Sequence, residues 1–227
     1  MKTGAIAVFV KTPGFSPVKS RLSKTIGEEK AEMFYLLSVS ATKALIEQYT
    51  QAYNIIPYWA VAEQGASHYW KDFQIITQEG GTLGHRLSSV YNRLLKKHKF
   101  VFLIGADSPM ISIAILKEAI SQVKNSFVLG RALDGGFYLF GGEKKISEDI
   151  WVSIPYSHSK TAEKLHEKIR VLGSIYELPP LLDIDTFSDL RKMYSDYKEQ
   201  NKLLPEQRKL LLWMKTILFS FYFLIYF

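Results

Sequence analysis

The sequence predicts an α/β fold, a three-layer sandwich in which helices cover both faces of a mostly parallel central sheet. Short apolar runs alternate along the chain with longer stretches in which apolar residues recur every three or four positions. The run FVFLIG at 100–105 is apolar throughout, as in a central parallel strand that is covered on both faces. A length of 227 residues suits one large domain with a substantial core.

The alternation defines the elements in order. Strands are predicted at 4–10, 54–61, 73–77, 100–105, 126–130, 136–141 and 174–177, and helices at 28–49, 83–98, 112–124, 159–171 and 187–200. Pro57 has no N–H to donate, so the second strand is expected at an edge of the sheet or at a bulge. Thr25 with Glu28, and Thr186 with Asp189, have capping-box spacing and predict two helix starts.

The composition is that of an ordinary folded protein, with 47% hydrophobic and 22% charged residues. Lys and Arg number 29 and Asp and Glu 22, so the net charge is +7. That charge suits a solubilising surface, an anionic substrate such as a nucleotide, an anionic membrane or nucleic acid. Nucleic acid is not expected, because no aromatic–basic stripe or known motif appears. The absence of cysteine excludes disulfides, iron–sulfur clusters and cysteine nucleophiles, and it is compatible with the cytoplasm.

The two ends of the chain are both hydrophobic, with different expected roles. The N-terminal apolar run at 5–10 is too short for a signal peptide and is read as a first strand. Residues 1–204 are expected to form the domain and 205–227 a hydrophobic tail, with Lys215 as the single charge after residue 209. As a helix the apolar part would run about 27 Å, close to the thickness of a membrane core. The tail then either lies on an anionic membrane, packs on the domain or a partner subunit, or is a gene-boundary artefact; Lys215 favours shallow insertion over a full span.

The first candidate site is the basic loop KTPGFSPVKSRL at 11–22, directly after the first predicted strand. Its turn at Gly14 exposes backbone N–H groups, and the cations of Lys11, Lys19 and Arg21 suit phosphate oxygens. The spacing matches neither a Walker loop nor the GxGxxG fingerprint. The alternative is a solvated basic loop.

A glycine-containing loop, TQEGGTLGHRL at 77–87, leads into the predicted helix at 83–98. Gly80, Gly81 and Gly84 permit close approach of the backbone to a ligand near a helix N-terminus. The alternative is a flexible connection, with His85 as a surface residue.

Three aspartates follow predicted strands. Asp107 comes just after the most buried strand, where a carboxylate can hold a divalent cation against phosphates, or where it or Ser108 caps a helix. Asp183 and Asp185 alternate, so they share one side of an extended segment and can complete a metal site with Asp107. The alternative is that Asp185 or Thr186 caps the next helix.

A tight turn is predicted at Asp134-Gly135-Gly136, within VLGRALDGGFYLFG. Asp-Gly is by itself a hairpin signal, so the turn has either a purely structural role or one against the substrate. The five histidines are scattered, and no catalytic triad or histidine metal pair appears.

Together and in this order, FVKTPG…VKSRL, Q…GTLGHRL, LIGADSP, LGRALDGGFYLFG and DIDT resemble the radical-SAM/selenodomain-associated transferases, which are small bacterial glycosyltransferase-like proteins. The resemblance covers about residues 4–200. It implies the nucleotide-diphospho-sugar transferase (GT-A) fold, with molybdenum-cofactor and 2-phospho-lactate guanylyltransferases as more distant relatives. The chain departs from the family pattern at Ser16-Pro17, where Gly-Arg is expected, at Thr82 and His85, where acids are expected, and at Tyr156, where Trp is usual.

The resemblance implies a role for each motif. The residues implied to bind the nucleotide are Lys11, Thr12, Pro13, Gly14, Lys19, Arg21, Gln78, Gly81, Leu83, Gly84 and Asp107. Those implied in catalysis are Lys19, Arg21 and Asp134, and those implied to border the sugar or acceptor are Asp134, Gly135 and Gly136. Mg²⁺ or Mn²⁺ would be held by Asp107 and Asp185.

The expected function is therefore metal-dependent transfer of a sugar from a nucleotide-diphospho-sugar to an acceptor. One alternative is a nucleotidyltransferase that takes a nucleoside triphosphate and releases pyrophosphate, since the same residues serve either reaction. A second is a non-catalytic nucleotide-binding protein. The expected location is the cytoplasm. If the tail is membrane-associated, it is expected to lie on the inner face of the membrane. The oligomeric state stays open.

Overall fold

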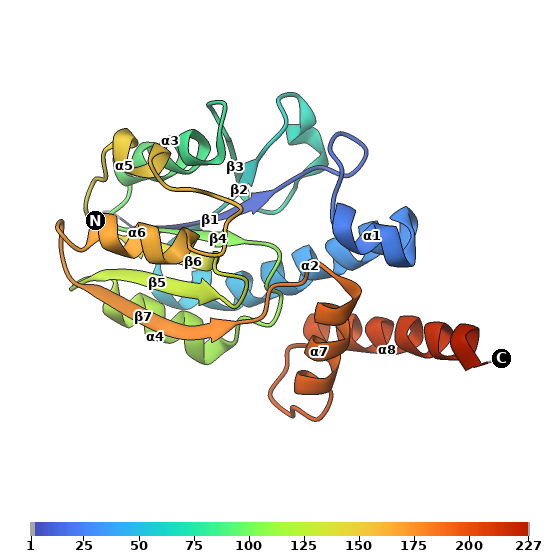
Figure 1. Ribbon diagram of the computed structural model, residues 1–227. Coiled ribbons are helices and arrows are strands. Elements are labelled where there is room, and N and C mark those ends of the chain that lie inside the picture. Colours follow the sequence, from blue (N-terminus) through green and yellow to red (C-terminus); the bar gives the residue numbers. More distant parts are fainter. Residues whose placement is uncertain (1–2, 227) are drawn as a thin grey trace.

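The computed structural model describes residues 3–226 and contains one seven-stranded mixed sheet (Figure 1). The strands are β1 (Gly4–Val10), β2 (Ile55–Val61), β3 (Gln74–Thr77), β4 (Val101–Gly105), β5 (Phe127–Ala132), β6 (Phe137–Gly142) and β7 (Ile175–Leu181). Their order across the sheet is β3-β2-β1-β4-β6-β5-β7. Strand β6 runs antiparallel to both of its neighbours, and every other pair is parallel. The predicted α/β class and mostly parallel sheet are confirmed.

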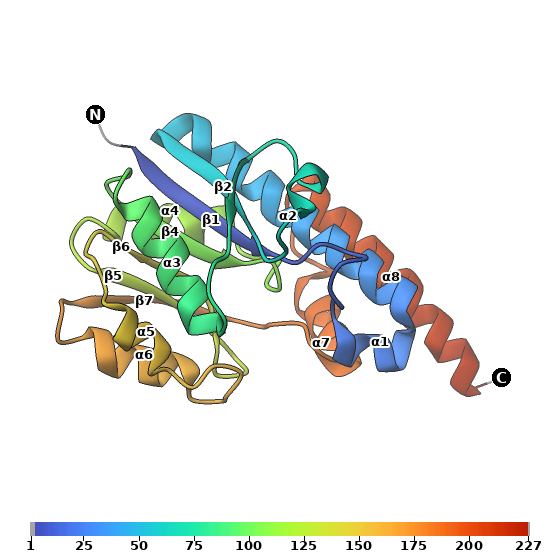
Figure 2. The ribbon, with the colours of Figure 1, turned by 90° about the horizontal axis from the view of Figure 1, so that it is seen from above.

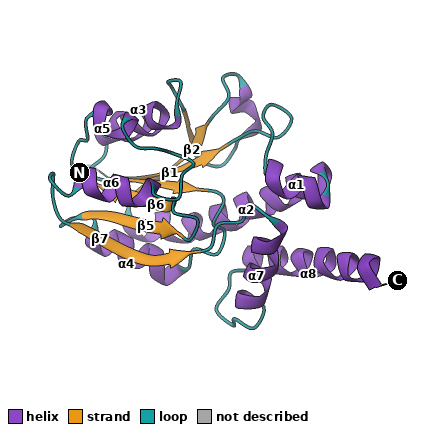
Figure 3. Cartoon of the chain, viewed as in Figure 1, coloured by secondary structure: helices purple, strands orange, loops and turns teal. Residues whose placement is uncertain are grey.

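Helices cover both faces of this sheet, as Figures 2 and 3 show. The helices are α1 (Ser20–Ile26), α2 (Glu28–Tyr53), α3 (Leu83–Leu95), α4 (Ile113–Gln122), α5 (Glu148–Val152), α6 (Thr161–Ile169), α7 (Phe187–Tyr197) and α8 (Pro205–Tyr226), with a 3₁₀ turn at Ala66–Tyr69. Helices α2 and α4 pack on one face, and α3, α5 and α6 pack on the other. Of these elements, α1, α5 and the 3₁₀ turn have no counterpart among the predicted segments.

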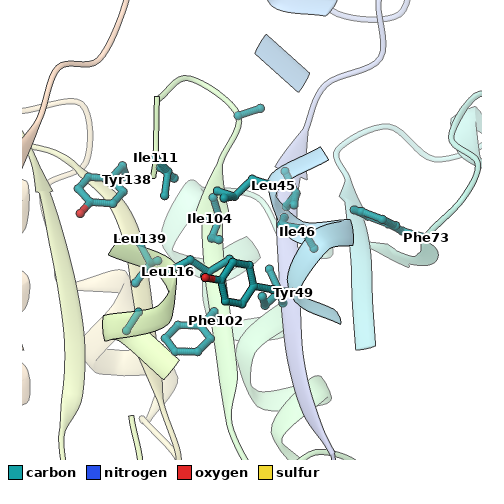
Figure 4. Packing of buried hydrophobic residues seen from close by; sticks show 14 of the residues in the cluster. Leu45, Ile46, Tyr49, Phe73, Phe102, Ile104, Ile111, Leu116, Tyr138 and Leu139 are labelled. Atoms are coloured by element: carbon teal, nitrogen blue, oxygen red, sulfur yellow. The ribbon is translucent and has the colours of Figure 1, made fainter. Parts of the chain in front are cut away.

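Strand β4 shows why the residues of a central strand are apolar at every position. Phe102 and Ile104 lie with Leu45 on the side of α2 and α4 (Figure 4), whereas Val101 and Leu103 belong to the cluster on the opposite face. Successive side chains of a strand point to opposite faces, so a sheet with two helical layers needs apolar residues on both.

Two local expectations are corrected. Strand β2 is interior, because it pairs with β1 on one side and β3 on the other. Pro57 is tolerated there because the pairing with β3 begins only at Tyr58. The capping box at Thr186 and Asp189 is confirmed, but Thr25 lies inside α1, and α2 instead starts after Gly27 with a φ of 88°.

The tail forms helix α8, which packs along α2 and α7. Leu210, Met214 and Ile217 are buried against these helices. The side-chain amide of Gln207 donates to the carbonyl oxygens of Pro109 and Ile111, at 2.9 and 3.0 Å. The last turns of α8 run beyond the rest of the domain (Figures 1 and 2). Within residues 3–226, no helix is both long and apolar enough to cross a membrane.

Candidate functional site

A cavity of about 680 Å³ lies at the carboxyl ends of β1 and β4, where ligands bind in sheets of this kind. Of the predicted site residues, those that line it are Lys11, Lys19, Arg21, Gln78, Leu83, Asp107, Asp134, Gly136 and Asp185. Those outside the lining are Thr12, Pro13, Gly14, Gly81, Gly84 and Gly135. The loops that the sequence analysis selected therefore converge on one cavity, although not every residue in them faces it.

Lys19 lies at the centre of an acidic cluster. Its Nζ is 2.6 Å from Asp107 Oδ1, donates to the carbonyl oxygen of Ile184 at 2.6 Å, and is 3.7 Å from Asp185 Oδ1. Only 3% of the side chain is exposed. Burial by itself would lower the pKa of Lys19, but the neighbouring carboxylates outweigh burial and raise the pKa. The amine is therefore an ammonium ion that is paired with acids, and it does not point freely into the cavity.

Asp183 is the least satisfied member of this cluster. Its Oδ1 is buried and has no hydrogen-bond partner among the described residues. Burial raises the pKa of Asp183 to about 7, and the charge of Lys19 opposes that rise. A buried carboxylate oxygen without a donor is costly in a folded protein and is one mark of a functional site.

The segments on either side hold this cluster in place. Lys19 has left-handed backbone angles, φ 49° and ψ 43°, immediately before α1, which is an uncommon conformation for a residue other than glycine. Arg21 Nη1 donates to Asp185 Oδ2 at 3.1 Å, and most of the arginine side chain is exposed. Thr186 caps α7, so Asp185 remains available to the cavity. Ser112 caps α4, so Asp107 and Ser108 do not cap it.

The start of the basic loop is fixed by backbone contacts. The N–H of Lys11 donates to the Tyr35 hydroxyl, which donates back to the Lys11 carbonyl oxygen. Thr12 is buried; its N–H donates to Glu63 Oε2 and its hydroxyl accepts from Trp70 Nε1. Thr12 thus anchors the loop internally, and its expected contact with the nucleotide stays a prediction. The exposed ammonium of Lys11 has no partner among the described residues.

The glycine loop contributes fewer ligand-facing groups than expected. Gln78 lines the cavity and donates its amide to the carbonyl oxygen of Ala60 at 2.8 Å. A Cβ at Gly84 would lie 2.7 Å from the carbonyl oxygen of Trp151, so Gly84 permits α3 to pack on α5. Gly81 is exposed, away from the cavity. Neither glycine lines the cavity, and their expected contacts to base or ribose stay predictions.

Arg86, which is not among the predicted site residues, lines the cavity from the first turn of α3. Its guanidinium has no hydrogen-bond or ion-pair partner in the described part of the chain. The signal was present, because residues three apart share a helix face and Leu83 had been selected.

The hairpin turn at Asp134-Gly135-Gly136 is confirmed between β5 and β6. Asp134 Oδ1 accepts from the N–H of Gly136 at 2.8 Å. Gly135 has a φ of 93°, and a Cβ there would lie 1.9 Å from the carbonyl oxygen of Ser159. This close approach brings the loop before α6, with His158, to the cavity wall. Only Tyr156 of this loop was named from the sequence, as a departure from the family pattern, and His158 was missed because no local pattern marks it.

The acidic cluster contains the oxygen donors of a metal site but not its arrangement. Within residues 3–226, no three Asp, Glu or His groups converge as a ready-made metal site, and Lys19 Nζ is bonded to Asp107 beside Asp185. The donor chemistry nevertheless fits Mg²⁺ or Mn²⁺, because carboxylate oxygens are the ligands these ions prefer and Asp183 Oδ1 lacks a partner.

Comparison with known families and curated proteins gives one match. A family model described as "Uncharacterized protein conserved in bacteria (DUF2064)" matches residues 45–158. No curated protein matches the chain significantly.

Solved structures share the whole architecture. A protein from Desulfovibrio desulfuricans G20, described as a "putative nucleotide-diphospho-sugar transferase", is similar at TM-score 0.80 and 23% identity, with 96% of this chain and 99% of that chain covered. The 4-diphosphocytidyl-2C-methyl-D-erythritol synthase of Anaerococcus prevotii DSM 20548 has TM-score 0.55 and 10% identity, covering 87% and 99%. Rv0371c of Mycobacterium tuberculosis H37Rv, in complex with manganese, has TM-score 0.50 and 16% identity, covering 85% and 98%. At these identities the likeness establishes the fold.

Proposed function

The chain belongs to the protein family DUF2064, whose description gives no activity, and we propose from its site that it is a metal-dependent transferase. In this proposal it binds a nucleotide-diphospho-sugar and transfers the sugar to an acceptor. The motif resemblance to the radical-SAM/selenodomain-associated transferases supports the same class. So does the structural likeness to the Desulfovibrio protein, which extends through most of the chain.

One observation carries the proposal. A single cavity combines two cations without partners among the described residues, Lys11 and Arg86, with the acidic cluster of Asp107, Asp183 and Asp185. A diphosphate needs both the cations and the carboxylates, because cationic side chains bind its oxygens directly and carboxylates bind it through a bridging divalent cation.

Each group then has a defined task. A bound divalent cation would neutralise charge on the diphosphate and stabilise it as a leaving group. Asp107 and Asp185 would hold that cation. Lys11 would act as a point charge, and Arg86 would bind two phosphate oxygens through its planar guanidinium group. Asp134 would border the sugar, where an acceptor oxygen attacks the anomeric carbon as the bond to the nucleoside diphosphate breaks.

Nucleotidyl transfer is the second candidate, favoured by the likeness in fold to the Anaerococcus synthase. The acceptor would then be a phosphorylated small molecule that attacks the α-phosphorus of a nucleoside triphosphate, and pyrophosphate would leave. The same cations and carboxylates would act in that reaction, because charge neutralisation and positioning dominate both.

Thermal stabilisation of the full chain separates these candidates. Ligands that bind the folded state alone raise the unfolding midpoint, so nucleoside diphosphates, triphosphates and nucleotide sugars are compared with and without Mn²⁺. The full chain is required because α8 buries Leu210, Met214 and Ile217 against the domain. Metal-dependent stabilisation by a diphosphate or its sugar supports glycosyl transfer, and preference for a triphosphate supports nucleotidyl transfer. No stabilisation by any nucleotide would overturn both.

For the tail, the proposal is peripheral contact with an anionic membrane from the cytoplasmic side. It is restricted to the face of α8 that carries the exposed side chains of Leu212 and Phe219, because the opposite face is buried. Sedimentation with vesicles of anionic phospholipid tests it. Binding that decreases in the double variant Leu212→Gln and Phe219→Gln supports the contact, and absence of binding by the parent chain removes it.

A further inference from the structure

Lys19 occupies the position among the carboxylates that a divalent cation would need. We propose that Lys19 is an internal counter-ion of the acidic cluster, which an incoming divalent cation displaces toward the phosphates of the ligand. The inference rests on the metal-dependent part of the proposed function. It adds that cation binding and the release of Lys19 are one event.

The contacts of the ammonium group leave it little capacity for a ligand. Its three N–H groups face Asp107 Oδ1 at 2.6 Å, the Ile184 carbonyl oxygen at 2.6 Å and, more distantly, Asp185 Oδ1 at 3.7 Å. A lysine ammonium has three donors and no more. Two of the three donors are therefore used within the protein, so Lys19 can direct at most one N–H to a phosphate oxygen unless it leaves Asp107 or the Ile184 carbonyl oxygen.

Charge makes this departure conditional on a replacement. If Lys19 moved away alone, Asp107 would lose its short ion pair and the buried oxygen of Asp183 would lose its nearest cation. The cost falls mainly on Asp183, whose carboxyl group is buried and would stay desolvated without a cation, whereas the half-exposed side chain of Asp107 can be solvated. A divalent cation that enters between Asp107 and Asp185 replaces the lost charge and accepts the carboxylate oxygens as ligands. The ammonium of Lys19 and the divalent cation would repel each other if both lay between Asp107 and Asp185, so each excludes the other from that position.

The position of Lys19 in the chain allows the exchange. It lies between the loop at 11–18 and α1, with left-handed backbone angles. Arg21, two residues later, keeps a contact with Asp185 from a largely exposed position. The acidic cluster therefore retains one cation when Lys19 leaves.

The inference predicts that Lys19 lowers the affinity of the free protein for divalent cations. Binding of Mn²⁺ alone is measured by the loss of the free-ion signal in electron paramagnetic resonance, for the parent chain and for Lys19→Met. We expect the variant to bind Mn²⁺ about tenfold more tightly, within the usual range of coupling between sites. Arg21→Met is the control, because it removes the same charge from Asp185 at an exposed position without touching the pair with Asp107; its gain in Mn²⁺ affinity should be much smaller.

The outcomes separate this inference from the proposed function. If the parent chain binds Mn²⁺ and Lys19→Met binds it no more tightly than Arg21→Met, the exchange is wrong while the metal site stands. If no protein binds Mn²⁺, the metal-dependent function fails and the exchange fails with it.

A measurement on the parent chain covers the case in which Lys19→Met does not fold. Acetylation of lysines by an N-hydroxysuccinimide ester is followed by peptide mass spectrometry, with exposed Lys24 of α1 as internal reference. Buried and ion-paired Lys19 should react slowly, and bound Mn²⁺ should raise its rate several-fold relative to Lys24. An unchanged rate at Mn²⁺ concentrations that give bound ion would overturn the proposal.

Discussion

The amino and carboxyl ends of β1 and β4 differ in whether their buried polar groups have complete hydrogen bonds. At the amino ends, His98 is buried and both of its ring nitrogens are bonded, Nδ1 to the Thr3 hydroxyl at 3.0 Å and Nε2 to the Tyr58 hydroxyl at 2.9 Å. At the carboxyl ends, carboxylates surround Lys19, and Asp183 keeps one buried oxygen without a partner.

The difference distinguishes a structural end of the sheet from a chemical one. Folding alone favours buried polar groups whose hydrogen bonds are complete. Unmatched carboxylates and a left-handed lysine cost stability, and they persist where a ligand completes them. On this argument, substitutions of the charged residues at the carboxyl end should affect ligand chemistry more than stability, and substitution of His98 at the amino end should do the reverse.

The largest expected effect is that of Asp107→Asn. The amide oxygen can still accept from Lys19, so the fold should persist, but the charge that holds a divalent cation is lost. We expect transferase activity to fall roughly 100- to 1,000-fold, as for removal of one electrostatic group in a preorganised site. Turnover is measured with the nucleotide substrate that thermal stabilisation identifies.

Asp196→Asn is the control for Asp107→Asn. Asp196 is an exposed residue of α7 outside the cavity lining, so its activity should equal that of the parent chain. Full activity in Asp107→Asn would show that the acidic cluster is structural and would remove the contrast between the two ends of the sheet.

Gly135→Ala comes next in size. Alanine at a φ of 93° is strained, and its Cβ would lie 1.9 Å from the Ser159 carbonyl oxygen, so the turn and the loop before α6 must separate. We expect a loss of about 1–3 kcal/mol in the free energy of unfolding, measured by urea denaturation. Gly81→Ala is the matched control, because nothing lies within 4 Å of its Cβ position and it should change stability little. Equal stability of the two variants would mean that the turn is not packed as described.

The parts predicted correctly from sequence are those that local patterns encode. The alternation of apolar runs gave the seven strands, because a strand covered on both faces must be apolar at successive positions. The Asp-Gly turn and the Thr186–Asp189 box involve neighbours in the chain, and both are present. The prediction of an edge strand from Pro57 was wrong, because the tolerance of proline there depends on where the pairing of β2 with β3 begins, and that is set by tertiary structure.

The site was predictable as a set of loops but not as a set of contacts. Topology brings together the ends of successive parallel strands, so the cavity follows from the motif order. The pairing of Lys19 with Asp107 and Asp185 joins three distant segments, and no spacing in the sequence encodes it. Lys19 was expected to face phosphates because a basic loop was considered without the acids that fold against it. The functional roles of these residues stay predictions.

The smallest expected effect is at the amino end, where His98 makes the free energy of unfolding depend on pH. Burial lowers the pKa of His98 below its usual 6.5, because the charged ring would be desolvated. As pH falls below 6.5 the unfolded chain therefore takes up a proton before the folded one does. The unfolded state then holds more protons, so the free energy of unfolding decreases with falling pH in this window and is fully restored above it. His98→Gln should remove this dependence in denaturation measured between pH 7 and 5, whereas His68→Gln, at an exposed histidine, should keep the parental curve. If the curve of His98→Gln also matched the parent, the amino end would contain no protonation-sensitive buried group, and the contrast would rest on the carboxyl end alone.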